Sequence, residues 1–268
     1  MHTYKRLLTI AGSDSGGGAG IQADLKTFSA CGCFGMSAIT AITAQNTLGV
    51  TAIHGVPTEV LVVQIKAVIE DIGVDAVKIG MLHSPEVVTA VASALKEYQL
   101  KNIVLDPVMV ATSGDPLIEE DGIAAMQEEL FPMVRLITPN VPEAELLLGE
   151  KIDDDDLSTT AQALAEKFSI SVLAKAGHLA SEEVIDVLYD NETRQQHSFT
   201  GDRLATRNNH GTGCTLSSAI AAFLAKDNNL SDAVAKALDY VRDALAAGAE
   251  YKIGEGHGPV HHFHNFWK

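Results

Sequence analysis

The chain alternates short apolar segments with longer segments of helical periodicity, and this alternation restricts its fold more than any other feature. Strands are predicted over residues 7–11, 36–45, 50–56, 75–82, 102–110, 135–140 and 171–177. Helices are predicted over residues 21–32, 57–73, 84–100, 119–131, 141–149 and 158–168, and two more follow residue 211, one ending near 226 and one over 231–249. Strands that are apolar throughout are buried on both faces, which is typical of a parallel sheet between two helix layers.

We therefore predict one α/β domain over residues 1–268, a three-layer α/β/α sandwich with a mostly parallel central sheet. Residues 184–190 and 194–200 are expected to form an antiparallel hairpin around Asn191-Glu192. Ser84, followed by Pro85, and Ser158 are predicted to cap helices.

Charge and cysteine content exclude several functional classes. The net charge is −16 and Lys and Arg are scattered, so the chain lacks the basic surface of a nucleic-acid-binding protein. Its apolar runs fall short of the roughly 20 residues that a membrane helix needs, and no signal peptide is evident. We expect a cytoplasmic protein with free thiols, in which Cys31 and Cys33 are small buried packing residues.

Polar and glycine residues follow almost every predicted parallel strand. Ligands of open α/β sheets bind beyond the carboxyl ends of the strands, so these residues are expected to share one site. They are the glycine loop 12–20, Gly80-Met81, Asp106-Pro107-Val108, Asn140 and Glu143, Lys175, and the turn 211–214.

The glycine loop does not match the common nucleotide fingerprints. A dinucleotide motif would need glycine at position 23, which is Ala23, and Lys26 does not lie in a Walker sequence. Nicotinamide enzymes and P-loop NTPases are therefore disfavoured. The loop either lets a ligand approach the backbone closely or is only a flexible turn.

The turn 211–214 begins a predicted helix. Glycines at 211 and 213 leave backbone N–H groups free at the positive end of the helix dipole, which favours binding of a transferring phosphoryl group. Cys214 lies in the first turn, where the dipole favours a thiolate that takes a proton from an attacking hydroxyl or holds it in line. The alternative is that Cys214 is a small buried residue behind a helix cap.

Carboxylates and an asparagine at the same edge suit Mg²⁺, which prefers oxygen ligands and keeps several waters. Asp106 and Glu143 are the candidate metal residues, with Asn140 beside them. Asn140 and Glu143 also fit a helix cap and its capping-box partner. Lys175 is either a cation for polyphosphate or an ordinary surface lysine.

Six blocks in this order resemble one family. They are GSDSGGGAGIQADLKT (12–27), TAQNT (43–47), KIGML (78–82), LDPVMV (105–110), TPNVPEAE (138–145) and HGTGCTLSSAIAA (210–222). Together they resemble the hydroxymethylpyrimidine/phosphomethylpyrimidine kinases of thiamine biosynthesis, within the ribokinase superfamily. The resemblance implies a ribokinase-like fold, use of ATP and Mg²⁺, and a homodimer. The implied reaction phosphorylates 4-amino-5-hydroxymethyl-2-methylpyrimidine and then its monophosphate.

The resemblance also implies roles for individual residues. Gln45 and Asp24 would hold the pyrimidine, although the residues alone also allow a polar loop residue and a helix-surface charge. The remaining roles are a ring pocket at Gly12, Met81 and Val108, ATP contacts at Asn140, Lys175 and Thr212, and catalysis at Gly211, Thr212, Gly213 and Cys214. The loop 12–20 would close against water.

Cys214 stands where most of the superfamily has Asp, and we hypothesise that this reduces repulsion of an already phosphorylated substrate. Ala176 follows Lys175 where the family more often has glycine. The histidine-rich tail is expected to be a packed strap rather than a metal site. The alternatives are a pyridoxal kinase, a kinase of both substrates and a non-catalytic ligand sensor.

Overall fold

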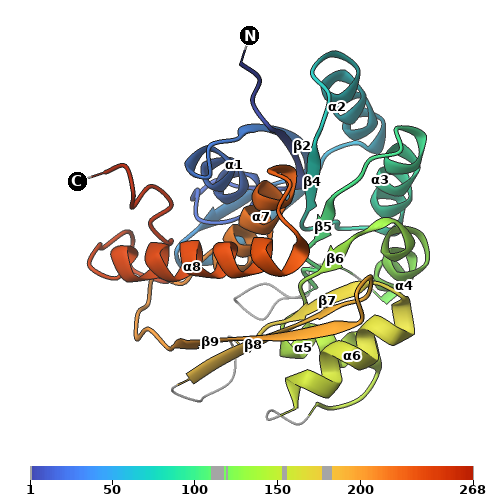
Figure 1. Ribbon diagram of the computed structural model, residues 1–268. Coiled ribbons are helices and arrows are strands. Elements are labelled where there is room, and N and C mark those ends of the chain that lie inside the picture. The colour runs from blue at the N-terminus through green and yellow to red at the C-terminus, as the bar shows by residue number, and fades with distance from the viewer. Residues whose placement is uncertain (1, 110–117, 119, 153–155, 177–182, 268) are drawn as a thin grey trace.

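One mixed sheet organises the molecule (Figure 1). The computed structural model describes residues 2–109, 118, 120–152, 156–176 and 183–267. The nine strands have the order β3-β2-β1-β4-β5-β6-β7-β8-β9. Their bounds are β1 Arg6–Asp14, β2 Phe34–Asn46, β3 Gly49–Gly55, β4 Ala76–Ile79, β5 Ile103–Leu105, β6 Leu136–Ile137, β7 Ser171–Ala174, β8 Glu183–Asp190 and β9 Gln195–Asp202.

The centre of the sheet is parallel and its edges are antiparallel. Strands β2, β1, β4, β5, β6 and β7 pair in parallel. The predicted hairpin β8–β9 is present, with Asp190 opposite Gln195. At the other edge β3 pairs antiparallel with β2, which the sequence pattern did not predict. The parallel centre brings its carboxyl ends to one edge, where the expected site residues lie.

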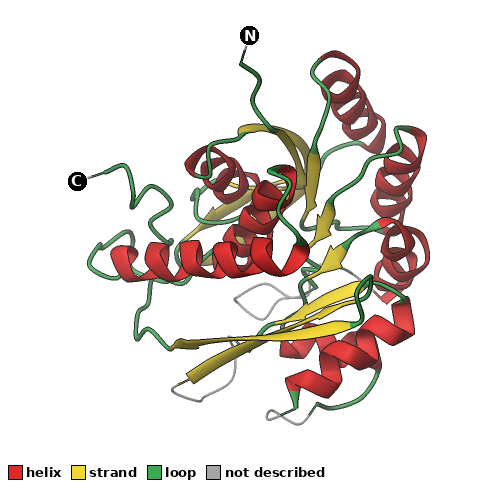
Figure 2. Cartoon of the chain, in the orientation of Figure 1, coloured by secondary structure: helices red, strands yellow, loops and turns green. Residues whose placement is uncertain are grey.

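Helices cover both faces of the sheet, which confirms the three-layer prediction (Figure 2). One core lies under α1 (Gly20–Ala30), α7 (Thr212–Ala225) and α8 (Leu230–Gly248). The other lies under α2 (Thr58–Asp71), α3 (Pro85–Glu97), α4 (Glu120–Ala125), α5 (Val141–Leu148) and α6 (Leu157–Phe168). After α4 the chain continues as a π-helical turn, Met126–Leu130, and a 3₁₀ turn, Phe131–Met133.

The strands nearest the site are shorter than predicted. The strand expected over 102–110 ends at Leu105 and the one over 135–140 ends at Ile137. The polar residues that follow, Asp106 and Thr138, still donate their backbone N–H groups to Ile79 O and Leu105 O, and their side chains bond to each other just beyond the strand ends. Residue 110 lies outside the described residues.

One predicted helix cap is confirmed and one is wrong. The Ser84 side chain accepts from the Val87 N–H. Helix α6 is capped by Asp156, whose carboxylate accepts from the Thr159 N–H at 3.0 Å. Ser158 instead lies inside the helix and accepts from the Gln196 amide. Asp is as good a cap as Ser, so the pattern alone could not separate them.

The cysteines that follow the first helix are buried packing residues, as predicted. Cys31 and Cys33 are buried, and burial raises the pKa of Cys31 to about 12. Among the described residues, no helix is both long and apolar enough to cross a membrane.

Candidate active site

The turn 211–214 has the geometry of an anion hole, but with fewer donors than expected. Gly211 adopts φ +80° and forms the N-cap of α7. Thr212 directs both its N–H and its hydroxyl to Asn209 O, at 3.3 and 2.7 Å, so its donors are already used. Within the described part of the chain, the N–H groups of Gly213 and Cys214 have no acceptor. These two amides are therefore the donors available to a ligand anion.

An ion pair faces this turn. Lys175 Nζ lies 3.0 Å from Asp106 Oδ1, and the same oxygen accepts from the Thr138 hydroxyl at 2.9 Å. A Cβ added to Gly213 would lie 3.4 Å from Asp106 Oδ2 and 3.6 Å from Lys175 Nζ. The glycine thus lets the helix start approach the pair closely. The site combines free amides with a cation and a carboxylate.

Lys175 is not an ordinary surface lysine. Its side chain is only 13% exposed. Burial opposes its charge, but Asp106 and Glu143 outweigh this effect and raise its pKa. Burial would also neutralise Asp106, but Lys175 and Lys78 hold the pKa of this carboxyl below its usual range. Both groups are therefore charged at neutral pH.

Asn140 and Glu143 form the capping box that the sequence allowed. Asn140 Oδ1 accepts from the Glu143 N–H, and Glu143 Oε2 accepts from the Asn140 N–H, each at 2.9 Å. Glu143 is buried, and burial raises its pKa to about 7, with Lys175 opposing the shift and Asp106 adding to it. Its carboxyl group is therefore poised between charged and neutral forms.

The expected Cys214 thiolate is not what the structure favours. Burial raises the pKa of this thiol to about 11, although Lys78 opposes the shift. The helix dipole is worth about 1 kcal/mol and does not compensate for lost hydration here. The structure therefore favours a neutral thiol at pH 7 over the expected thiolate, and Cys214 is partly rather than fully buried.

Asp24 also differs from both sequence interpretations. It is fully buried, so it is not a helix-surface charge. Its Oδ1 meets Lys78 Nζ at 2.9 Å and the Ser218 hydroxyl at 2.7 Å, and its Oδ2 meets Lys78 Nζ at 3.0 Å and the Thr9 hydroxyl at 2.6 Å. Because protein donors occupy both oxygens, the expected direct contact with a pyrimidine is not supported. Asp24 neutralises Lys78 and joins α1 to β1, β4 and α7.

The expected ring-pocket residues follow neighbouring strands, and two of them meet. A Cβ added to Gly12 would lie 3.3 Å from Met81 Cε, so these residues are in contact range. Met81 is further held through its carbonyl, which accepts from the Thr40 hydroxyl at 2.9 Å. Val108 is partly exposed in the loop after β5, and its N–H donates to Asp106 O at 2.8 Å. Gln45 is half-buried near the end of β2.

Asp14 organises the glycine loop, which the sequence did not reveal. Its carboxylate accepts from the N–H groups of Gly16, Gly18 and Ala19 at 2.8, 3.0 and 2.8 Å. Burial raises its pKa, but His210 and these N–H groups outweigh burial and lower it. These loop amides are thus satisfied internally and are not a second anion site.

Two further residues, Lys78 and His210, were also missed as site residues. Lys78 is fully buried and lies close enough to Cys214 and Asp106 to affect their charges. A fully buried lysine is rare unless paired, so an isolated Lys in the apolar strand 76–79 was the signal that was available. His210 lies directly before the turn, in the most distinctive motif of the chain.

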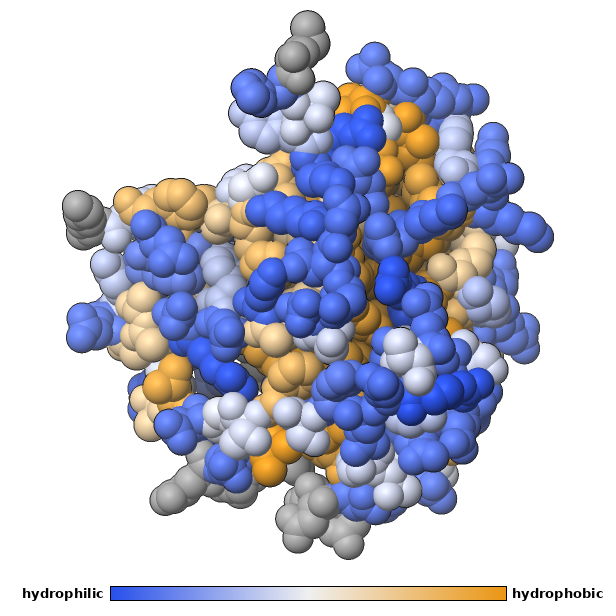
Figure 3. Space-filling model, in the orientation of Figure 1, coloured by the Kyte–Doolittle hydropathy of each residue, from blue (hydrophilic) through white to orange (hydrophobic). Residues whose placement is uncertain are grey.

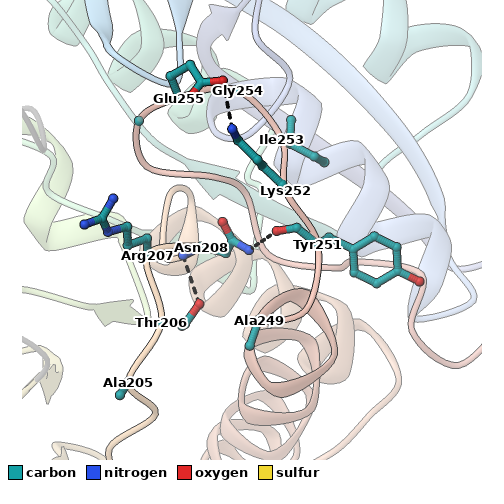
Figure 4. A pocket seen from close by; sticks show the side chains of 11 residues that line it. Ala205, Thr206, Arg207, Asn208, Ala249, Tyr251, Lys252, Ile253, Gly254 and Glu255 are labelled. Atoms are coloured by element: carbon teal, nitrogen blue, oxygen red, sulfur yellow. Dashed lines mark hydrogen bonds and ion pairs between the residues drawn. The ribbon is translucent and has the colours of Figure 1, made fainter.

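A pocket of about 380 Å³ lies between the segments 205–208 and 249–256, and none of the expected site residues lines it (Figure 4). Asn208 Nδ2 closes its floor by donating to Tyr251 O at 2.6 Å. The charged groups Lys252 and Glu255 pair with each other at 3.0 Å. Arg207 is a further charged residue of the lining.

Comparison with known proteins shows which family the chain resembles. The family model described as phosphomethylpyrimidine kinase matches residues 14–261. A hydroxymethylpyrimidine/phosphomethylpyrimidine kinase of Rhizobium meliloti is 51% identical over 97% of this chain and 98% of its own length. The Escherichia coli protein of the same name is 46% identical over 97% and 98%.

Two solved structures of kinases are also similar to the chain over most of its length. The crystal structure of phosphomethylpyrimidine kinase from Clostridium difficile is 43% identical, with a TM-score of 0.78, and the match covers 89% of this chain and 98% of that one. A pyridoxal kinase from Staphylococcus aureus, in complex with AMP-PCP and pyridoxal, is 32% identical, with a TM-score of 0.89 over 99% and 96%. The fold is ribokinase-like, and the chain belongs to the phosphomethylpyrimidine kinase family.

Proposed function

We propose that this protein uses ATP to phosphorylate the hydroxymethyl group of 4-amino-5-hydroxymethyl-2-methylpyrimidine, and then the resulting monophosphate, in thiamine biosynthesis. The observation that carries the proposal is the position of the free Gly213 and Cys214 amides against Lys175 and Asp106. Relatives that bear this kinase name and match nearly the whole chain support it.

The mechanism relies on positioning and electrostatics. Phosphoryl transfer passes through a loose transition state with charge on the equatorial oxygens, so little covalent help is needed. The amides of Gly213 and Cys214, with Lys175, bind those oxygens, and the Gly211 turn aims the amides. We propose that Asn140 and the Thr212 oxygen contact the nucleotide.

The neutral Cys214 thiol orients the substrate hydroxyl. A sulfur lone pair accepts from the hydroxyl and holds its oxygen in line with the phosphoryl group. Because the transition state is loose, the hydroxyl keeps its proton until late and passes it to an oxygen of the transferred phosphoryl group, while ADP leaves. Because the thiol carries no charge at pH 7, it adds no repulsion when the substrate already carries a phosphate.

Few carboxylate oxygens would be free to hold Mg²⁺ at this site. Lys175 already occupies Asp106 Oδ1, and Glu143 Oε2 is used in the capping box, so neither carboxylate offers a full set of ligands. We propose that Asp106 and Glu143 would hold Mg²⁺ mostly through its water molecules. When bound, Mg²⁺ neutralises phosphate charge.

A pyridoxal kinase activity is the second candidate, alone or beside the first. The observation that favours it is the high structural similarity to pyridoxal kinases at 32% identity. Gln45 favours the pyrimidine, because a carboxamide can pair in two directions with an amino group and its neighbouring ring nitrogen. A non-catalytic sensor is disfavoured, since the anion hole and the ion pair are both formed.

We further propose a cytoplasmic homodimer, with residues 1–268 as one kinase domain that binds neither nucleic acid nor membrane. Apolar side chains reach the surface around α2, at the upper right of Figure 3. Val60 and Val63 of α2 and Ile53 of β3 are each at least 46% exposed, an apolar patch that a second copy would cover. Light scattering should give twice the mass of 28.4 kDa, and a single-chain mass would refute this part.

Product analysis tests the reaction. The purified protein is given ATP·Mg²⁺ with the pyrimidine alcohol, its monophosphate or pyridoxal, and the products are weighed by mass spectrometry. We expect one phosphate added to each pyrimidine substrate, and the pyrophosphate after prolonged reaction with the alcohol. Transfer to pyridoxal alone would establish the second candidate, and no transfer to any of the three would leave only the sensor.

A further inference from the structure

His210 links the glycine loop to Gln45. Its Nε2 lies 3.0 Å from Asp14 Oδ2 and 3.4 Å from the terminal amide group of Gln45. The backbone holds the ring in place, since the His210 N–H donates to Gly258 O at 3.0 Å and the ring packs against Gly18. The ring is mostly buried, at 13% exposure. This contact is not needed for the anion hole, so its purpose is open.

The neighbours of Gln45 decide how its amide is turned. An ionised Asp14 only accepts hydrogen bonds, so His210 Nε2 must carry the hydrogen that points at it. On the other side, Thr43 gives its single hydroxyl hydrogen to Ser13 O at 2.9 Å and can only accept from Gln45, 3.2 Å away. The Nε2 hydrogen points mainly at Asp14 and offers Gln45 only the longer branch of a bifurcated bond, at 3.4 Å. With this N–H on one side and an acceptor, Thr43, on the other, one orientation of the amide is favourable.

That orientation places the Gln45 oxygen toward His210 and its nitrogen toward Thr43, the reverse of the placement in the structure, where the nitrogen lies 3.4 Å from His210 Nε2 and the oxygen 3.2 Å from the Thr43 hydroxyl. Amide oxygen and nitrogen have nearly the same shape, so the hydrogen-bond network decides between them. The opposite orientation sets the amide nitrogen against the His210 N–H and the amide oxygen against a hydroxyl that has no hydrogen left. In the favoured orientation, one N–H and one oxygen lone pair of Gln45 stay free.

We propose that His210 is a positioning residue that fixes the amide of Gln45 for recognition of a ring with an amino group beside a ring nitrogen. The inference rests on the proposed function, in which Gln45 binds the pyrimidine. The free N–H of Gln45 meets the ring nitrogen and its free lone pair meets the amino group. Pyridoxal has no such amino group, so His210 acts on the choice of substrate through Gln45.

Three substitutions separate this role from a merely structural one. His210→Gln places an amide N–H where the ring Nε2 lies, His210→Asn places it near Nδ1 instead, and His210→Leu removes the donor. For the pyrimidine alcohol, we expect KM to rise about 10-fold in His210→Leu and His210→Asn, because one oriented hydrogen bond is lost. The KM of His210→Gln for the alcohol should stay within about 3-fold of the wild-type value. The KM for ATP should be the same in all three variants as in the wild type.

A second background shows whether His210 acts through Gln45. In a Gln45→Ala protein, His210→Leu should raise the KM for the alcohol no further, because the amide to be positioned is gone. The same rise in both backgrounds overturns the proposal, as does a His210→Gln protein as impaired as His210→Asn. A fall in kcat without a rise in KM also overturns it. Thermal unfolding of each variant checks the fold, and the Gln/Asn pair suffices if His210→Leu does not fold.

A measurement on the substrate-free protein distinguishes failure of the His210 proposal from failure of the proposed kinase function. In NMR spectra of the free protein, the side-chain NH₂ protons of Gln45 should show contacts to the Thr43 methyl group and not to the His210 ring. Contacts to the ring instead overturn the inference, whatever the enzyme phosphorylates. Failure of the wild-type protein to phosphorylate either pyrimidine would refute the proposed function while this result still stands.

Discussion

Cys214 shows how one side chain can serve two successive reactions. A carboxylate at this position would lie near Asp106, and both would repel a substrate that already carries a phosphate. The thiol occupies the same place without charge, since burial raises its pKa to about 11. The absence of charge at Cys214, rather than its nucleophilicity, is the property that the site uses.

Substitution of Cys214 by Asp tests this interpretation. Two like charges about 4 Å apart repel by up to about 4 kcal/mol in a partly buried site. We expect kcat/KM for the monophosphate to fall at least about 10-fold more than kcat/KM for the alcohol. Cys214→Ser is the matched control, because it keeps a neutral hydrogen-bonding group, and it should impair both steps alike. Equal losses in Cys214→Asp would contradict the charge argument.

At the scale of the elements, the start of α7 is held by the glycine loop. Gly211 has φ +80°, and a Cβ there would collide with the carbonyl oxygen of Gly18. Gly149, which ends α5, has nearly the same φ of +82° but open space around it. A substitution at Gly149 would therefore strain only the backbone, whereas one at Gly211 would also break the contact with the glycine loop.

Alanine at each of these glycines should have different effects. Gly149→Ala is expected to cost about 1 kcal/mol of unfolding free energy and to leave kcat unchanged, because only the backbone conformation is strained. Gly211→Ala must also push the glycine loop away and displace the two free amides. A shift of this kind costs about 100-fold in kcat. Urea unfolding measures the loss of stability and steady-state kinetics measures kcat for each variant. Similar kcat values for the two variants would refute a role for the contact between Gly211 and Gly18.

The arrangement of the strands could be predicted from the sequence, but the partners of buried side chains could not. Apolar strands with polar residues at their ends correctly predicted the parallel centre of the sheet and the edge where Asp106, Glu143 and Lys175 meet. The pattern could not predict partners that come from distant segments. Asp24 is buried against Lys78 and Ser218 only because α1 packs on α7, and helical spacing alone left it a surface charge.

For the whole molecule, two buried titratable groups make the free energy of unfolding depend on pH in opposite directions. His262 is buried beside Thr215, and burial lowers its pKa from 6.5 to about 3. The unfolded chain therefore binds a proton that the folded chain refuses, and this contribution to stability is lost as pH falls below 6.5. Its burial also confirms that the histidine-rich tail packs as a strap against α7 and α8.

Glu143 acts in the opposite direction. Its pKa is raised from 4.5 to about 7, so between these values the folded protein holds a proton that the unfolded chain has released. Its contribution is present below pH 4.5 and is lost as pH rises through 7, at about 1.4 kcal/mol per pH unit. Glu143→Gln keeps an oxygen for the Asn140 N–H but removes the titration. We therefore expect urea unfolding to show the variant gaining stability over the wild type from pH 4.5 to 7, with a constant difference above. A difference that does not change with pH would mean that Glu143 is charged throughout, and that the ion pair of Lys175 and Asp106 tolerates a second carboxylate beside it.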